Sequence, residues 1–269
     1  MTRFENKSIA FTKASACGND FLIAPGDGVD ELSDLTRRLC DRHNGVGADG
    51  VEWTFADAES DVRVRLFNAD GSEAEISGNG TRCVAAEICL RTAQQEVKVR
   101  TAAGVKTCRL IEKRGAEFDF ESDMGRAEVG TQLAIETMWV RAVGTQVSMG
   151  NPHFVIFVEK FPEDWRKQAA LIQTQPQFPQ GTNVEYVVVR GLNEIEIRLF
   201  ERGVGETLSS GTGSCASAVA AIAGRRVESP VKVVAPGGAQ TVRWEHTGDL
   251  NQVHLRGAAR LVCRGEYFL

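Results

Sequence analysis

The sequence predicts an α/β fold of the α+β type, made of two similar halves in which a sheet wraps around one buried helix. The segment 65–80, RLFNADGSEAEISGNG, recurs at 198–213 as RLFERGVGETLSSGTG, with the matching positions at a constant offset. Each copy begins in a stretch of alternating apolar residues, which is typical of a strand. Each is followed by a run of small and apolar residues, which is typical of a buried helix.

Both halves predict the same order of elements. Strands are expected first, then a Ser-Gly-x-Gly turn, a buried helix and a hairpin with a glycine turn. A sheet around one helix suits this order better than alternating βαβ units. We place the halves at residues 1–130, joined by the tail at about 258–269, and at 131–257. The predicted elements are strands at 61–67 and 194–200, helices at 31–44, 81–94 and 214–226, and hairpins at 97–109 and 231–243.

Composition excludes several classes of function. The chain has 269 residues, of which 42% are hydrophobic and 25% charged, as in ordinary globular proteins. A net charge of −5 disfavours nucleic-acid and anionic-membrane partners. No apolar run is long enough to span a membrane, and the start of the chain lacks an apolar signal region, so a cytoplasmic protein is expected.

Neither a metal nor a cofactor is predicted. The seven cysteines are irregularly spaced without a CxxC pair, and the four histidines show no metal-binding spacing. We interpret Cys17, Cys40, Cys83, Cys89 and Cys108 as core or incidental thiols. The segment GVGADG at 45–50 has the glycine spacing of a dinucleotide-binding turn, but it follows a predicted helix instead of a strand, so dinucleotide binding is rejected.

The two Ser-Gly-x-Gly turns, at 77–80 and 210–213, are candidate anion sites. Free N–H groups in the first turn of a helix and the positive end of its dipole bind carboxylates. The ordinary alternative is a serine N-cap before a glycine turn, and the occurrence of two matching copies favours a site.

Other candidates lie near these turns in the repeat. Glu201-Arg202 ends a predicted strand nine residues before Ser210, although a solvated charge pair is the usual interpretation of such a dipeptide. His153 lies in MGNPHF, where a structural histidine is the alternative. Asn183 precedes a strand, and Gly18-Asn19 is echoed at Gly150-Asn151.

Four motifs together resemble the diaminopimelate epimerase family over nearly the whole chain. They are FTKASACGNDF (11–21), RLFNADGSEAEISGNGTRC (65–83), MGNPH (149–153) and ERGVGETLSSGTG (201–213). The resemblance implies two halves, each a β-barrel around a central helix, with the active site in the cleft between them. It also implies cofactor-independent interconversion of LL- and meso-diaminopimelate in lysine and cell-wall synthesis, by a homodimer.

In this family one cysteine thiolate removes the α-proton and a second thiol delivers a proton to the opposite face. The resemblance implies catalytic positions at Ser77, Ser210, His153 and Glu201. It implies substrate binding by Asn19, Asn68, Gly78, Asn79, Asn151, Asn183, Glu201, Arg202, Gly211 and Thr212. Gly50 stands where some relatives have a longer polar residue, so a substrate contact there is not expected.

The chain departs from the family at the two critical positions, because Ser77 and Ser210 replace the cysteines. A thiol ionises near pH 8.5, whereas a serine hydroxyl stays protonated, and the sequence shows no base that would activate either serine. Losing a general acid or base costs about 10²–10⁴-fold in rate, so little or no epimerase activity is predicted.

Several explanations of the serines remain open. They fit an engineered double Cys→Ser substitution, which the intact binding residues favour, or natural divergence of a duplicated gene. The alternative functions are a racemase or epimerase of another amino acid, such as histidine or a hydroxyproline, and a non-catalytic amino-acid-binding paralogue.

Overall fold

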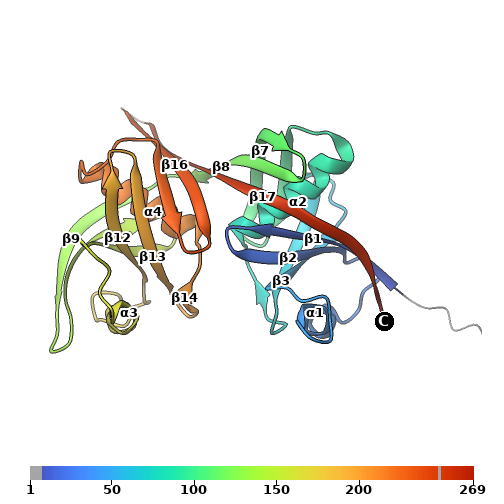
Figure 1. Ribbon diagram of the computed structural model, residues 1–269, viewed down its shortest axis with the longest axis horizontal. Helices are drawn as coiled ribbons and strands as arrows, with labels where there is room; N and C mark the ends of the chain where they lie inside the picture. Colours follow the sequence, from blue (N-terminus) through green and yellow to red (C-terminus); the bar gives the residue numbers. More distant parts are fainter. Residues whose placement is uncertain (1–7, 248–249) are drawn as a thin grey trace, which may run out of the picture. The chain divides into compact units, whose positions relative to one another are not determined.

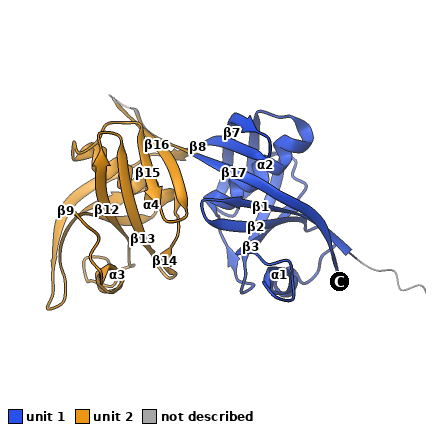
Figure 2. Cartoon of the chain, in the orientation of Figure 1, with its two compact units in different colours: residues 1–122, 257–269 blue, residues 123–256 orange. Residues whose placement is uncertain are grey.

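The computed structural model describes residues 8–247 and 250–269 and divides the chain into two compact units (Figure 2). The N-terminal unit comprises residues 1–122 and 257–269, and the C-terminal unit residues 123–256. The sequence-based boundary after residue 130 falls inside strand β9 (Glu128–Glu136). The stretches 1–7 and 248–249 of the predicted halves lie outside the described residues.

The N-terminal unit is a barrel of eight strands around one helix (Figure 1). Each strand pairs with the next and the last returns to the first: β1 (Ser8–Ala16), β2 (Asn19–Pro25), β3 (Gly50–Phe55), β4 (Val62–Asn68), β6 (Glu96–Thr101), β7 (Gly104–Arg114), β8 (Glu117–Gly125) and β17 (Leu250–Phe268). The short β5 (Glu73–Ala74) pairs with β4. Helix α2 (Gly78–Thr92) is buried along most of its length, which confirms the prediction of a sheet around one helix.

The C-terminal unit repeats this arrangement around α4 (Gly211–Ala223). Its strands follow in pairs from β9 through β10 (Arg141–Ser148), β11 (Pro152–Phe157), β12 (Asn183–Gly191), β13 (Glu194–Glu201), β15 (Val231–Ala235) and β16 (Gly238–Thr247) to β17. The short β14 (Gly205–Thr207) pairs with β13. Because nearly every residue of α4 is small or apolar, the helix can be enclosed by strands on all sides.

Each unit carries a second, outer helix that connects two parallel strands. Helix α1 (Leu32–Cys40) joins β2 to β3, and α3 (Trp165–Gln173) joins β11 to β12. Both pack an apolar stripe on the outside of their barrel. The predicted helix at 31–44 therefore ends at Cys40, and α3 was not predicted. Each unit contains βαβ crossovers as well as the enclosed helix.

The duplication extends to strand register. Val51 pairs with Phe67 between β3 and β4, and Val184 pairs with Phe200 between β12 and β13, at the same offset along the chain as the two serine turns. The register brings the start of β3 beside the end of β4, and the start of β12 beside the end of β13. These strand ends carry several of the predicted site residues.

Candidate active site

Both buried helices begin at a serine that caps them. Ser77 Oγ accepts a hydrogen bond from the Gly80 N–H at 3.1 Å, and Ser210 Oγ accepts one from the Gly213 N–H at 3.2 Å. Both serines have extended backbone conformations, as N-cap residues do. The serines therefore act as N-caps, and each side chain stands at the positive end of a helix dipole.

In the N-terminal unit, an asparagine from the β1–β2 turn contacts the serine turn. Asn79 Nδ2 donates to Asn19 Oδ1 at 2.8 Å, while Asn19 Nδ2 donates to Asp49 Oδ2 at 3.1 Å. Arg82, which is 1% exposed, donates to Asn79 Oδ1. The predicted residues Asn19, Ser77, Gly78 and Asn79 are thus brought together at the start of α2.

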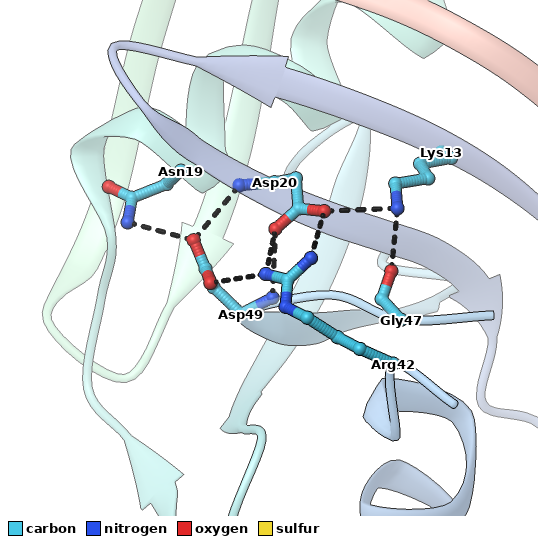
Figure 3. Close-up of polar contacts among 6 residues, drawn as sticks. All are labelled: Lys13, Asn19, Asp20, Arg42, Gly47 and Asp49. Atoms are coloured by element: carbon cyan, nitrogen blue, oxygen red, sulfur yellow. Dashed lines mark hydrogen bonds and ion pairs between the residues drawn. The ribbon is translucent and has the colours of Figure 1, made fainter. Parts of the chain in front are cut away.

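Figure 3 shows the ionic network that supports Asn19. Arg42 bridges Asp20 and Asp49 at 2.8 Å each, and Lys13 lies 3.0 Å from Asp20. Burial raises the pKa of Asp20, but hydrogen bonds from Arg42 and Lys13 outweigh it and hold that pKa below its ordinary value. The GVGADG segment therefore supplies Asp49 as a support for Asn19.

The predicted residue Asn68 does not join the network, and Gly50, where no substrate contact was expected, does not join it either. Asn68 is exposed at the end of β4, and its amide donates to Ser72 Oγ at 3.0 Å. A side chain at Gly50 would place its Cβ 2.6 Å from the Phe67 carbonyl oxygen, so close strand packing accounts for the glycine.

In the C-terminal unit, a chain of hydrogen bonds runs from the barrel interior to α4. His153 Nδ1 lies 2.7 Å from Glu185 Oε1, and its Nε2 lies 3.0 Å from Asn151 Oδ1. Asn151 Nδ2 donates to Thr212 Oγ1 at 3.4 Å. Burial raises the pKa of Glu185, and the neighbouring His153 opposes this shift. Three predicted site residues, Asn151, His153 and Thr212, therefore meet through direct contacts.

A second set of contacts involves Ser210 and the end of β13. The Ser210 hydroxyl donates to Glu201 Oε2 at 3.3 Å, so a carboxylate lies beside this serine where the sequence showed no base. Asn183 Oδ1 accepts from the Arg202 backbone N–H at 2.9 Å. The Arg202 guanidinium donates to the Gln180 carbonyl and makes no ion pair with a carboxylate among the described residues.

Two buried carboxyl groups were not predicted from the sequence. Glu52 and Glu185 stand at equivalent positions of the repeat, in Val-Glu-Trp and Val-Glu-Tyr, and are 2% and 1% exposed. A Cβ on Gly80 would overlap Glu52 Oε1, and one on Gly213 would lie 3.1 Å from Glu185 Oε1. Burial raises the pKa of Glu52 to about 8. Extending the repeat upstream of residue 65 would have found both.

No thiol takes the place of the serines within the turns. Cys40, Cys83, Cys89 and Cys108 are buried, as expected for core thiols. Burial raises the pKa of Cys40 to about 12 and that of Cys89 to about 11. Cys17 is only partly buried. Across residues 8–247 and 250–269, no group of three or more potential ligands is arranged to hold a metal ion.

A solved structure shares the fold. The phenazine biosynthesis protein of the PhzF family from Bacillus anthracis superposes with a TM-score of 0.73, covering 98% of this chain and 100% of that chain at 15% sequence identity. The chain therefore shares its fold with that structure. None of the described helices is both long and apolar enough to cross a membrane.

Sequence comparison assigns the chain to one family. The sequence model of the family described as Diaminopimelate epimerase matches residues 11–129 and 145–262. The diaminopimelate epimerase of Desulfovibrio desulfuricans is 36% identical over 97% of this chain and 99% of the relative. That of Desulforudis audaxviator is 38% identical over 96% of this chain and 98% of the relative. The chain belongs to the diaminopimelate epimerase family, which is a family of isomerases, and the predicted resemblance is confirmed.

Proposed function

We propose that the protein recognises diaminopimelate and is built to interconvert its LL and meso forms by proton transfer at the α-carbon, without a cofactor. We further propose that this transfer is impaired because serines occupy both proton-transfer positions. The observation that carries the proposal is the pair of equivalent serine-capped helix starts.

The binding chemistry follows from the groups at the helix starts. Backbone N–H groups in the first turns of α2 and α4 can hold the α-carboxylate and stabilise the charge that develops when the α-proton leaves. Arg202 can bind the distal carboxylate in a forked geometry because its guanidinium has no carboxylate partner in the described structure. Asn19, Asn151 and Asn183 supply amide groups for the substrate's ammonium and carboxylate ends.

The proposed impairment lies in the proton-transfer step. A cysteine at either cap would lie at a helix N-terminus, where the dipole lowers a thiol pKa toward neutrality. A serine hydroxyl gains little from the same position because its proton is far less acidic. Glu201, 3.3 Å from the Ser210 hydroxyl, is a carboxylate and thus too weak a base to remove that proton to a useful extent.

The test measures α-deuterium uptake from D₂O into LL-diaminopimelate. We expect the double variant Ser77→Cys/Ser210→Cys to exchange the α-hydrogen about 10²–10⁴-fold faster than the unmodified chain. Each single variant supplies one thiol and serves as an intermediate case. Ser217→Cys adds a thiol in the interior of α4, away from the cap, and is expected to change nothing. A folded double variant that binds diaminopimelate without exchange would refute the proposed reaction.

Other outcomes would identify other functions. Tight binding without exchange in both the unmodified chain and the double variant, in a protein whose gene encodes both serines, would make it an amino-acid-binding paralogue. Exchange in a hydroxyproline or histidine, and not in diaminopimelate, would assign a different substrate. We also propose a cytoplasmic homodimer acting in lysine and peptidoglycan synthesis, without nucleic-acid or membrane partners. Light scattering of the purified chain tests the dimer.

A further inference from the structure

The residues around the serine turn at the start of α2 and at the start of α4 each form a half-site. Both half-sites contain a contact between an asparagine and the middle residue of the Gly-x-Gly turn. In the N-terminal unit this contact joins Asn19 to Asn79, and in the C-terminal unit it joins Asn151 to Thr212. Both asparagines follow the echoed glycine of their half, and both turn residues follow the first glycine of their turn, so the pairs are equivalent in the repeat. The asparagine amides, however, are oriented in opposite directions.

The orientation follows from the second partner of each amide. Asn19 directs its oxygen to Asn79 because its amino group donates to the carboxylate of Asp49 at 3.1 Å. Asn151 directs its amino group to Thr212, while its oxygen faces His153 Nε2 at 3.0 Å. The second partner of Asn19 is therefore a hydrogen-bond acceptor, whereas the second partner of Asn151 is a donor.

The donor behind Asn151 depends on Glu185. An amide oxygen only accepts hydrogen bonds, so His153 Nε2 must carry a hydrogen. Nδ1 of the same ring lies 2.7 Å from Glu185 Oε1, and the two atoms share a proton. Both side chains are almost fully buried, at 0% and 1% exposure, so water offers no alternative partner. The carboxyl group thus fixes the ring in its plane and directs Nε2–H at Asn151.

The N-terminal unit has the carboxyl group without the histidine. His153 stands opposite Asn183 between β11 and β12, and the equivalent pair between β2 and β3 is Phe21 and Gly50. Glu52, the equivalent of Glu185, therefore faces no imidazole, and its Oε1 has no hydrogen-bond partner. A buried carboxyl beside the helix start does not by itself reach the asparagine, and in this unit Asp49 orients Asn19.

We propose that Glu185 is a positioning residue of the C-terminal half-site, which acts through His153 to fix the Asn151 amide with its amino group toward α4. Asp49 has the corresponding role for Asn19, with the opposite polarity. Two half-sites with equivalent backbones thereby present different hydrogen-bonding groups to a ligand. The effect on the ligand rests on the proposed function, whereas the orientation of the side chains does not.

The first measurement is the protonation of the His153 ring, followed by ¹⁵N NMR of the full chain labelled at histidine. We expect Nε2 to be protonated in the unmodified chain. In Glu185→Gln, the glutamine amide can donate to Nδ1, so Nδ1 should be an unprotonated acceptor while Nε2 keeps its hydrogen. Protonation of Nδ1 with a bare Nε2, in either chain, would overturn the proposal. This readout does not require the protein to bind diaminopimelate.

The second measurement is the affinity for meso-diaminopimelate by calorimetry. Glu185→Leu removes the hydrogen-bond partner of His153 and is expected to weaken binding about tenfold, whereas Glu185→Gln should stay within about twofold. His153→Phe copies the arrangement at Phe21, and adding Glu185→Leu to it should produce no further loss. Glu52→Leu is the matched control, since that carboxyl is equally buried but does not contact a histidine or the asparagine among the described residues. The affinity of this variant for meso-diaminopimelate should be unchanged.

The outcomes separate the two proposals. Equal losses from Glu52→Leu and Glu185→Leu would show that the carboxyl groups act directly on the helix starts and would overturn the positioning role. An additive loss in the His153→Phe background would do the same. Failure of the unmodified chain to bind diaminopimelate would contradict the proposed function, and the NMR result would still decide the role of Glu185. If Glu185→Leu does not fold, as judged by circular dichroism, Glu185→Gln decides.

Discussion

The buried carboxyl group of Glu52 should make the stability of the protein depend on pH. Glu52 is 2% exposed, its Oε1 has no hydrogen-bond partner, and burial raises its pKa from an ordinary value of 4.5 to about 8. The folded protein therefore holds a proton that the unfolded chain releases. The stability that this proton contributes is complete below the ordinary carboxyl pKa and is lost as pH rises through the folded-state value.

The magnitude follows from the size of the shift. Between the two pKa values the folded state binds one proton more than the unfolded state, so the free energy of unfolding falls by about 1.4 kcal/mol per pH unit. From about pH 5 to about pH 8 the loss is on the order of 4 kcal/mol. Glu52→Gln has nothing to titrate, so the variant should gain stability relative to the unmodified chain by this amount across the same interval.

The assay is urea unfolding of the full chain at a series of pH values, followed by circular dichroism and by hydrogen exchange of the α2 amides. A constant offset between the two chains would reflect only the replacement of a carboxyl by an amide. The prediction concerns the slope with which the difference in the free energy of unfolding between the two chains changes with pH. Glu59→Gln removes a carboxyl whose side chain is 80% exposed and should leave the slope unchanged. Parallel stability curves for Glu52→Gln and the unmodified chain would refute the reasoning.

Three further substitutions test the geometry around the helix starts. Ser77→Ala removes the cap of α2 and should lower the free energy of unfolding by about 1 kcal/mol, measured in urea; an unchanged midpoint would contradict the capping role. Gly80→Ala would force a methyl group onto Glu52 and should cost about 1–3 kcal/mol, part of which Glu52→Ala in the same chain should restore. Asp49→Ala frees the Asn19 amide and should weaken diaminopimelate binding about tenfold by calorimetry, and a change within twofold would show that Asn19 needs no support.

The repeat was sufficient to predict the enclosed helices and the strands before them. Burial on all sides requires small or apolar residues around the whole helix, and this composition can be recognised in the sequence. The outer helices α1 and α3 also begin at equivalent positions of the repeat, but only an apolar stripe is required of them. Their sequences, LSDLTRRLC and WRKQAALIQ, consequently share little, and α3 went unrecognised.

The site could be predicted only where its residues follow the repeat or the family motifs. Glu52 and Glu185 were missed because a charged residue between apolar ones in a strand normally faces solvent. Here both face the barrel interior, beside the glycines at the start of each helix. The opposite amide orientations of Asn19 and Asn151 depend on partners from other strands and loops, which no local pattern contains.

The geometry also explains why two serines can be present without loss of the site. Serine is among the most favourable N-cap residues, and both serines accept the hydrogen bond that a helix start needs. Backbone and side-chain contacts that do not involve a thiol hold the neighbouring asparagines, Thr212 and Arg202 in position. Under the proposed function, the serines therefore affect the proton to be transferred and not the groups proposed to bind the substrate. A stable protein that binds diaminopimelate and exchanges its α-hydrogen slowly is the outcome that these contacts support.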